Sequence, residues 1–424
     1  NKMTAIVGTI NRRGVAFAAD SAATYTFASK SKITNNTNKI FALSKKHPVG
    51  VAIYNNLDFH GVPWENIFKM YRDDYLKDNS FDKLSQYADD FWRYVISDIL
   101  PKLVEDQKLH VTIMANGLWN ECLNTANEQI NQEGITKDSK NLFDKIMLIL
   151  KKISSDYSAF KRGAGFEDYS KDKLINYGDE IINKVLSTAL SNTDCPVDFK
   201  DVFVDALFWI MMADFSTYLS YTGLVFWGYG ETDLFPSYYE YHVDLAFDNH
   251  LKHVLTSEYE VSNKCNACVA PFAQTDVANT VVRGVDPSLR ATITDGLRGR
   301  FDNFRNDIVD ELAKVSAPQQ LIDVLNGIDI DDKVRPFIDD LNKYISDHYT
   351  DKLLETVAML SKEDLAEMAE SLVKMTCLKR HVTTDEETVG GPVDVAVITK
   401  GDGFIWIKRK HYFDPSLNHH YFEK

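Results

Sequence analysis

The chain has 424 residues, of which 44% are hydrophobic and 12% aromatic, enough to bury a large core in roughly two to three domains. Its formal net charge of −15 argues against a nucleic-acid-binding surface, because phosphate contacts need clustered lysine and arginine. It shows no apolar run near the ~18 residues of a membrane-spanning helix, no signal-peptide pattern, and too few cysteines for a disulfide framework. We therefore expect a soluble, cytoplasmic protein without nucleic-acid or membrane partners.

The N-terminal stretch predicts a β-hairpin followed by a third strand. Residues 5–10 and 15–19 are apolar and rich in β-formers, and the turn between them contains Gly14. The second strand runs directly into Asp20, and Lys39 opens a short β segment over 39–43. A threonine, a carboxylate and a lysine (Thr4, Asp20 and Lys39) are thus expected at the ends of neighbouring strands.

A strand over 49–54 is followed by a long stretch with helical periodicity. Pro63-Trp64-Glu65 predicts a helix start, with proline near the first turn. Further helices are expected over 81–105, 111–133, 139–160, 168–189 and 197–219. Much of this stretch is therefore assigned to a helical subdomain inserted over residues 75–219.

Strand patterns return after this stretch, over 223–228, 237–246, 253–261 and 267–273. Asp286-Pro287-Ser288 predicts a helix start ahead of an amphipathic helix over 301–315. Helices are also expected over 322–348 and 352–360, and Ser361 opens a capping box for a helix that continues to about residue 380. The chain then has a Gly390-Gly391 loop, a strand, a Gly401-Asp402-Gly403 turn and a closing strand over 404–408.

The N-terminal pattern resembles that of proteasome β-subunits and the peptidase subunits of bacterial two-component proteases, which are N-terminal nucleophile (Ntn) hydrolases. The family has an N-terminal threonine, a G-V-x-x-A-x-D-S segment and a lysine at the start of the third strand. Here the pattern appears as Thr4, then Gly14-Val15-Ala16-Phe17-Ala18-Ala19-Asp20-Ser21, then Lys39-Ile40. The C-terminal glycine loop and strand pair are also similar to the family's ending.

The resemblance implies an α+β fold, a four-layer αββα antiparallel sandwich with a large helical insertion. Residues 4–74 and 220–413 would form this core, residues 75–219 the insertion and residues 414–424 a tail. It also implies assembly into a homo-oligomer and no metal or cofactor. The residues leave open the substrate, the ring size and any ATPase partner.

The resemblance implies that Thr4 is the nucleophile of a threonine hydrolase that cleaves amide or peptide bonds. A threonine hydroxyl needs a base. We expect the natural chain to start at Met3, and removal of Met3 would then supply the α-amino group of Thr4, with a reference pKa of about 7.7–8.0. Lys39 would ease loss of the hydroxyl proton through its charge, and Asp20 would pair with Lys39 and fix it.

Other family positions carry different residues here. Tyr54 or Asn55 stands where the family has the glycine of the oxyanion hole, and Tyr229 replaces the serine of a G-S-G turn. Near Gly390, Glu386 aligns with a family aspartate, Asp385 is its alternative, and Val389 replaces a serine. These departures favour either an altered substrate or a second interpretation, a catalytically inactive proteasome-like assembly or binding protein.

Cys265-Asn266-Ala267-Cys268 is the one C-x-x-C sequence in the chain. A structural zinc site needs four ligands, and no second cysteine pair exists. We expect these cysteines to be structural.

Overall fold

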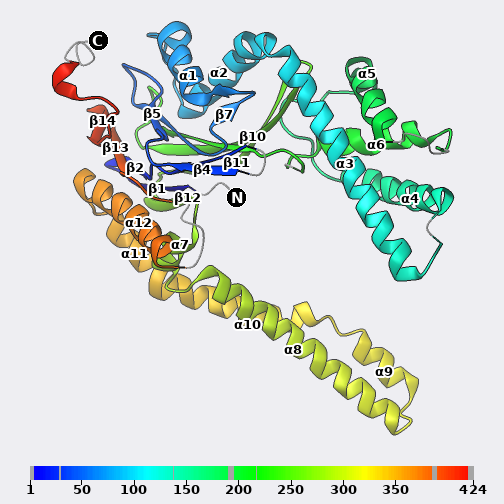
Figure 1. The fold of residues 1–424 in the computed structure, drawn as a ribbon. Coiled ribbons are helices and arrows are strands. Elements are labelled where there is room, and N and C mark those ends of the chain that lie inside the picture. The colour runs from blue at the N-terminus through cyan, green and yellow to red at the C-terminus, as the bar shows by residue number, and fades with distance from the viewer. Residues whose placement is uncertain are drawn as a thin grey trace.

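The computed structural model describes residues 4–27, 30–136, 138–189, 195–215, 217–383 and 389–418. Two five-stranded antiparallel sheets lie at its centre (Figure 1), in agreement with the predicted α+β class. The first sheet has the order β12 (Ala267–Ala273), β1 (Ala5–Asn11), β2 (Gly14–Ala19), β13 (Asp394–Thr399), β14 (Gly403–Lys408). The second has the order β11 (His250–Glu260), β10 (Ser237–Phe247), β9 (Thr222–Gly228), β6 (Val49–Asn55), β5 (Ile40–Ala42).

One hydrophobic cluster draws its side chains from both sheets and lies between them. At its centre Phe17 of β2 stacks on Trp227 of β9, with ring centroids 4.5 Å apart. Glycines make room for both rings, since a Cβ would lie 2.7 Å from the Phe17 ring at Gly8 and 2.6 Å from the Trp227 ring at Gly50.

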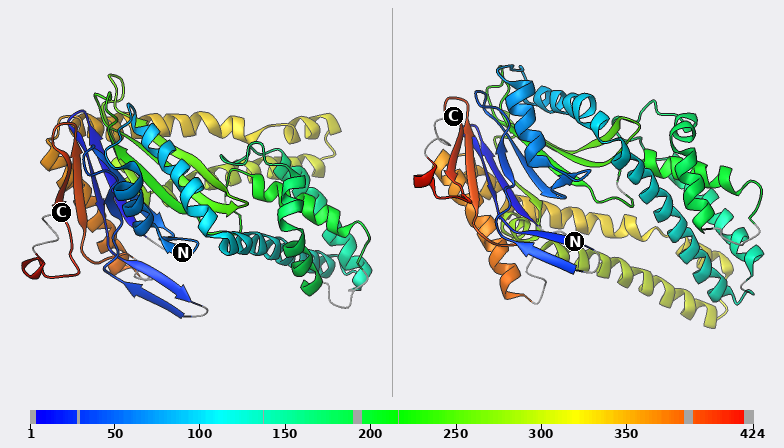
Figure 2. Two further views of the ribbon diagram at one scale, coloured as in Figure 1. Left: turned by 90° about the horizontal axis from the view of Figure 1, so that it is seen from above. Right: turned by 45° about the horizontal axis from the view of Figure 1, so that its top comes forward.

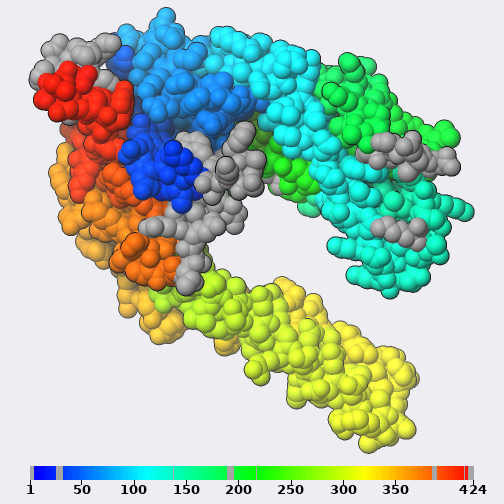
Figure 3. Space-filling view, in the orientation of Figure 1, coloured from blue at the N-terminus to red at the C-terminus, as the bar shows by residue number. Residues whose placement is uncertain are grey.

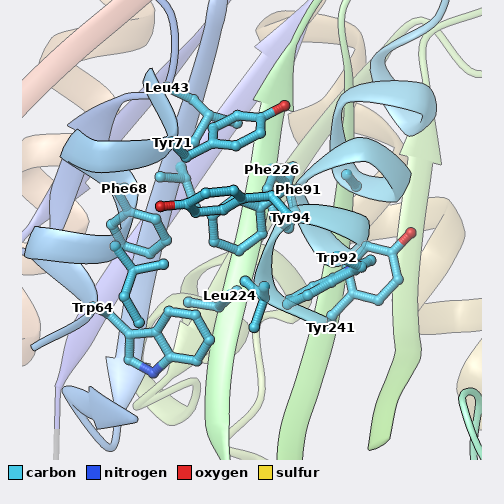
Figure 4. Packing of buried hydrophobic residues seen from close by; sticks show 14 of the residues in the cluster. Leu43, Trp64, Phe68, Tyr71, Phe91, Trp92, Tyr94, Leu224, Phe226 and Tyr241 are labelled. Carbon is cyan, nitrogen blue, oxygen red and sulfur yellow. The ribbon is translucent and has the colours of Figure 1, made fainter. Parts of the chain in front are cut away.

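Helices α1 (Trp64–Met70) and α2 (Leu84–Tyr94) share a second cluster with the other face of the second sheet (Figure 4). The ring centroids of Phe91 and Phe226 lie 5.5 Å apart, and those of Trp92 and Tyr241 lie 5.3 Å apart. Helix α2 therefore packs on the sheet, although the sequence analysis placed it within the inserted subdomain over 75–219. Its contact face is rich in aromatic residues, and periodicity alone could not assign that face to a partner.

Helices α7 (Asp276–Arg283), α11 (Asp351–Val357) and α12 (Lys362–Val382) share a third cluster with strands of the first sheet. The predicted capping box begins α12, because Ser361 Oγ accepts from Asp364 N and the Asp364 carboxylate accepts from Ser361 N. Helix α7 was not predicted, and its eight residues give only a short periodic signal.

Two helical projections extend from the same side of the sheets (Figures 1 and 2). The first consists of α3 (Val104–Glu133), α4 (Ser139–Ser158), α5 (Lys171–Ala189) and α6 (Phe199–Met212). It has a hydrophobic cluster of its own, which begins at Val111 and includes Leu245 and Phe247 from the end of β10. This projection corresponds to most of the predicted insertion.

The second projection, which we call the arm, consists of α8 (Pro287–Lys314), α9 (Gln319–Asn326) and α10 (Ile330–Ile345). A hollow separates it from the first projection (Figure 3). Helix α8 begins at the predicted cap, where Asp286 accepts from Ser288 N. The single helix expected over 322–348 is divided, because α9 ends at Gly327 and Asp329 caps α10 by accepting from Asp331 N.

Two short hairpins complete the described strands: β3 (Ala23–Phe27) with β4 (Lys30–Thr34), and β7 (Asp58–Phe59) with β8 (Val62–Pro63). The first lies between Asp20 and Lys39 in the chain. The sequence analysis did not predict it, because its threonines and lysines give no apolar alternation.

None of the described helices has the length and apolar character needed to cross a membrane. The cytoplasmic location stays a prediction.

The stack between the sheets predicts a graded effect of substitutions at Trp227, which is fully buried and whose Nε1 has no hydrogen-bond partner among the described residues. Trp227→Ala should lower the free energy of unfolding by about 3–5 kcal/mol through loss of contacts and a cavity. Trp227→Phe should cost far less, since it keeps a stacked ring and removes an unpaired N–H. Urea denaturation followed by circular dichroism measures both, and equal losses would contradict this packing.

A histidine pair connects the first projection to the sheets. His60, between β7 and β8, lies against His110 of α3 with ring centroids 4.0 Å apart, and His110 Nδ1 accepts from Ala246 N. Burial lowers the pKa of His60 to about 4, against the opposing charge of Asp106. Burial also lowers the pKa of His110 to about 3, and the charge of His60 acts in the same direction.

These lowered pKa values predict acid destabilisation. In the unfolded chain these histidines bind a proton near pH 6.5, whereas in the folded chain they stay neutral down to about pH 4. Stability should therefore fall as the pH drops below 6.5, by up to about 1.4 kcal/mol per pH unit for each histidine. His110→Asn should give a shallower slope in denaturation measured from pH 7 to pH 4.5, and an unchanged slope would contradict the assignment.

Candidate active site

Asp20 is fully buried directly after β2, and four N–H donors converge on its carboxylate. Oδ1 accepts from Ala5 N at 2.9 Å and from the Lys39 ammonium at 2.7 Å. Oδ2 accepts from Ala22 N at 3.0 Å and from Gly390 N at 3.1 Å. The carboxylate thus joins the start of β1, the segment after β2, the residue before β5 and the loop before β13.

Lys39 lies immediately before β5, and its side chain is as fully buried as that of Asp20. Its backbone is fixed by Ile53 N, which donates to Lys39 O at 2.9 Å. Burial lowers the pKa of Lys39, and the attraction of Asp20 opposes this shift without reversing it. The result is a desolvated ammonium that binds its proton less tightly than a lysine in water.

Thr4 precedes β1 and is 4% exposed in a chain that carries residues 1–3 ahead of it. Its carbonyl accepts from Gln274 N at 3.0 Å, which continues the pairing of β1 with β12. Ala5 N and the Lys39 ammonium share one oxygen of Asp20, so the ammonium lies within two hydrogen-bond lengths of the residue bonded to Thr4. The structure therefore brings Thr4, Asp20 and Lys39 together.

Asn55 ends β6 with φ of 67°, in the left-handed region that favours glycine and that asparagine tolerates. Asn55 is one of the two positions, with Tyr54, at which the sequence resemblance predicted the family's glycine. Its side chain donates to Tyr221 O at 2.8 Å.

Tyr54 belongs to the cluster between the sheets, where its hydroxyl donates to Glu240 Oε1 at 2.5 Å and lies 2.8 Å from His242 Nε2. Its ring lies against Gly223, where a Cβ would be 2.0 Å from it. Burial raises the pKa of Glu240 and lowers that of His242. The sequence analysis missed this polar cluster, because Glu240 and His242 alternate along β10 like residues of a solvent face.

Tyr229 does not join Asp20 and Lys39. It follows Gly228, which pairs with Val49 at the start of β6, whereas Lys39 lies beside Ile53 near the end of that strand. Its buried ring lies 5.8 Å from the ammonium of Lys400, beyond the end of β13. The turn after β9 therefore lies at the opposite end of β6 from Lys39.

The acidic candidates Asp385 and Glu386 lie outside the described residues. The neighbouring loop is described: Gly390 donates to Asp20 and accepts from Ser21 N at 3.0 Å. Gly391 has φ of 77°, and a Cβ there would lie 2.8 Å from Asn35 O. Gly391 thus has to be a glycine for the loop to close over Asp20, while Val389 is buried against the first sheet.

Two further side chains that were not predicted from the sequence, Lys410 and Cys377, lie near enough to Lys39 to act on its charge. Asp394, at the start of β13, forms an ion pair with Lys410, whose charge also acts to lower the pKa of Lys39. Cys377 of α12 is close enough for the charges of Asp20 and Lys39 to act on it, and burial raises its pKa to about 12. Cys377 is therefore a neutral thiol at neutral pH.

The Cys265-Cys268 pair carries no disulfide, and burial raises the pKa of Cys268 to about 12. Within the described ranges, no three His, Cys, Asp or Glu side chains are grouped to hold a metal ion.

Comparison with known proteins adds no family to these observations. No protein-family model matches the chain, and no curated protein matches it.

The network predicts a large stability effect for one-sided substitutions of the buried pair. Asp20→Asn would leave the Lys39 ammonium without a counter-charge and should cost about 3–5 kcal/mol in the free energy of unfolding. Lys39→Met should cost less, because the three backbone donors still satisfy Asp20. The double variant should lose less than the sum of the two, as measured by urea denaturation. Additive or negligible losses would contradict a coupled buried pair.

Proposed function

We propose that this chain is a proteasome-like Ntn hydrolase that cleaves amide or peptide bonds through an ester intermediate on Thr4. The observation that carries the proposal is the buried Lys39–Asp20 pair at 2.7 Å, bonded through the same carboxylate oxygen to the residue after Thr4. A fully buried ammonium destabilises a fold unless a counter-charge lies beside it, and Asp20 supplies that charge here.

The arrangement of sheets and helices also supports the proposal. Hydrophobic clusters lie between the two sheets and between each sheet and its helices. This is compatible with the four-layer αββα sandwich of Ntn hydrolases, to which the first projection and the arm would be additions.

In the proposed mechanism, the Thr4 hydroxyl attacks the carbonyl carbon of the scissile amide while the α-amine of Thr4 takes up its proton. The amine of the substrate leaves with that proton, and water then hydrolyses the ester to release the acid and regenerate Thr4. The Lys39 ammonium stabilises negative charge on the Thr4 oxygen, and Asp20 holds Lys39 in place. A free α-amine on Thr4 requires removal of residues 1–3.

The departures at Tyr54 and Asn55 fit this mechanism. An oxyanion hole needs a backbone N–H donor, which residues other than glycine also supply. The Tyr54 side chain lies between the sheets, and Asn55 retains the left-handed backbone.

A non-catalytic assembly or binding protein is the second candidate. It is favoured by the four donors on Asp20, since a carboxylate that joins four segments has a sufficient structural role without catalysis.

A covalent probe distinguishes the two candidates. A β-lactone should acylate the Thr4 hydroxyl in protein whose chain begins at Thr4, and peptide mapping by mass spectrometry would locate the adduct. Thr4→Ser should still react, Thr4→Val should not, and Lys39→Met should react on the order of 10² more slowly. Labelling that survives Thr4→Val, or that Lys39→Met leaves unchanged, would reject the proposed mechanism.

A further inference from the structure

The arm leaves several large apolar side chains exposed to solvent. Helix α8 has 28 residues, roughly 42 Å of helix, and none of them is buried. It pairs with α10 through polar contacts such as Arg298 with Asp331 at 2.8 Å. Yet Phe304 of α8 is 64% exposed and Phe337 of α10 is 50% exposed. Amphipathic helices gain most of their stability from packing an apolar face, which this arm leaves open.

Most of the exposed apolar residues form one stripe on each helix. They are Leu289, Ile293 and Phe304 on α8, and Phe337 and Tyr344 on α10. Phe301 of α8 is also exposed but lies outside this stripe. Their spacings of about one, three and two turns keep each set in line.

Both stripes lie on the same side of the hairpin. The inner side of α8 is marked by its half-buried residues, such as Leu297 and Ile308, and that of α10 by buried Val334. Viewed from the N-terminus of each helix, the stripe is rotated in the same sense from the inner side. Since the two helices run in opposite directions, rotations of the same sense end on one face.

The charges on α8 are divided between its halves. Arginines dominate the first half, which carries Arg290, Arg298 and Arg300 with Asp295. Carboxylates dominate the second half, which carries Asp302, Asp307, Asp310 and Glu311 with Arg305 and Lys314. A helix with this pattern is complementary to a second copy of itself in antiparallel orientation.

Two charges lie on the apolar stripe itself, one turn to either side of Phe304. Arg300 precedes this phenylalanine and Asp307 follows it. In the fully described arm, neither side chain forms an ion pair or a side-chain hydrogen bond. They are therefore available to an outside partner that presents the opposite charges in reverse order.

We propose that the arm binds a second copy of this chain, with the two α8 helices antiparallel across a two-fold axis at Phe304. The two Phe304 rings then meet at the axis, and Arg300 of each copy faces Asp307 of the other. The contact is isologous, so one favourable pair is made twice. Because one helix face is small compared with a standard interface, the dimer is reversible and concentration-dependent. The proposal does not depend on the threonine chemistry.

Charge reversals in the full-length chain test the pairing. Arg300→Asp and Asp307→Arg each place like charges opposite one another in a homodimer, so each variant alone should sediment as a monomer. An equimolar mixture of the two variants restores both opposite-charge pairs and should form heterodimers. The double variant in one chain should dimerise like the wild type. Analytical ultracentrifugation from 1 to 100 μM, on the order expected for a small interface, measures all four.

Asp339→Arg is the matched control, because Asp339 is an exposed carboxylate of α10 on the side away from the stripe. It should leave the sedimentation unchanged. Dimer formation by the mixture also shows that both single variants are folded. A wild-type chain that stays monomeric, single variants that associate like the wild type, or a mixture that stays monomeric would each overturn the proposal. If the wild type forms a larger assembly, an unchanged mass in the single variants overturns it equally.

Discussion

The structure depends on one buried carboxylate. Asp20 accepts from Lys39 and from three backbone amides, and these donors come from four separated segments of the chain. In the low-dielectric interior such a network is strong when every partner is present and costly when one is missing. It therefore aligns the starts of β1 and β13 with the residue before β5, and places Thr4 beside a desolvated ammonium. A single interaction thus links the geometry of the first sheet to the proposed chemistry.

The two projections differ in how they are stabilised, and this difference separates their roles. The projection formed by α3 to α6 has its own hydrophobic cluster and is anchored to β10 through Leu245 and Phe247. The arm has almost no buried residue and carries an open apolar stripe. The first can be stable within one chain, whereas the second gains stability from a partner.

The sequence predicted those parts of the fold that local pattern determines. The hairpin before Asp20, the strand that ends at Asn55 and the cap at Asp286 are signalled by alternation, glycine or a capping residue, and all appear in the structure. What depends on contacts between distant segments was not predictable. Tyr229 follows a well-predicted strand but lies at its far end, and the Tyr54–Glu240 contact joins residues 186 positions apart. That Lys410 and Cys377 lie near Lys39 likewise could not be predicted, because both are far from it in the sequence.

The central claim is that Thr4 acts as a nucleophile activated by its own α-amine, and the mass of the intact protein tests this most directly. Native, untagged protein purified from cells should have a mass that corresponds to a chain beginning at Thr4, with Met3 removed. Quantitative retention of Met3 would leave Thr4 without a free α-amine and would contradict the account. The buried Lys39–Asp20 pair would then be a structural element alone.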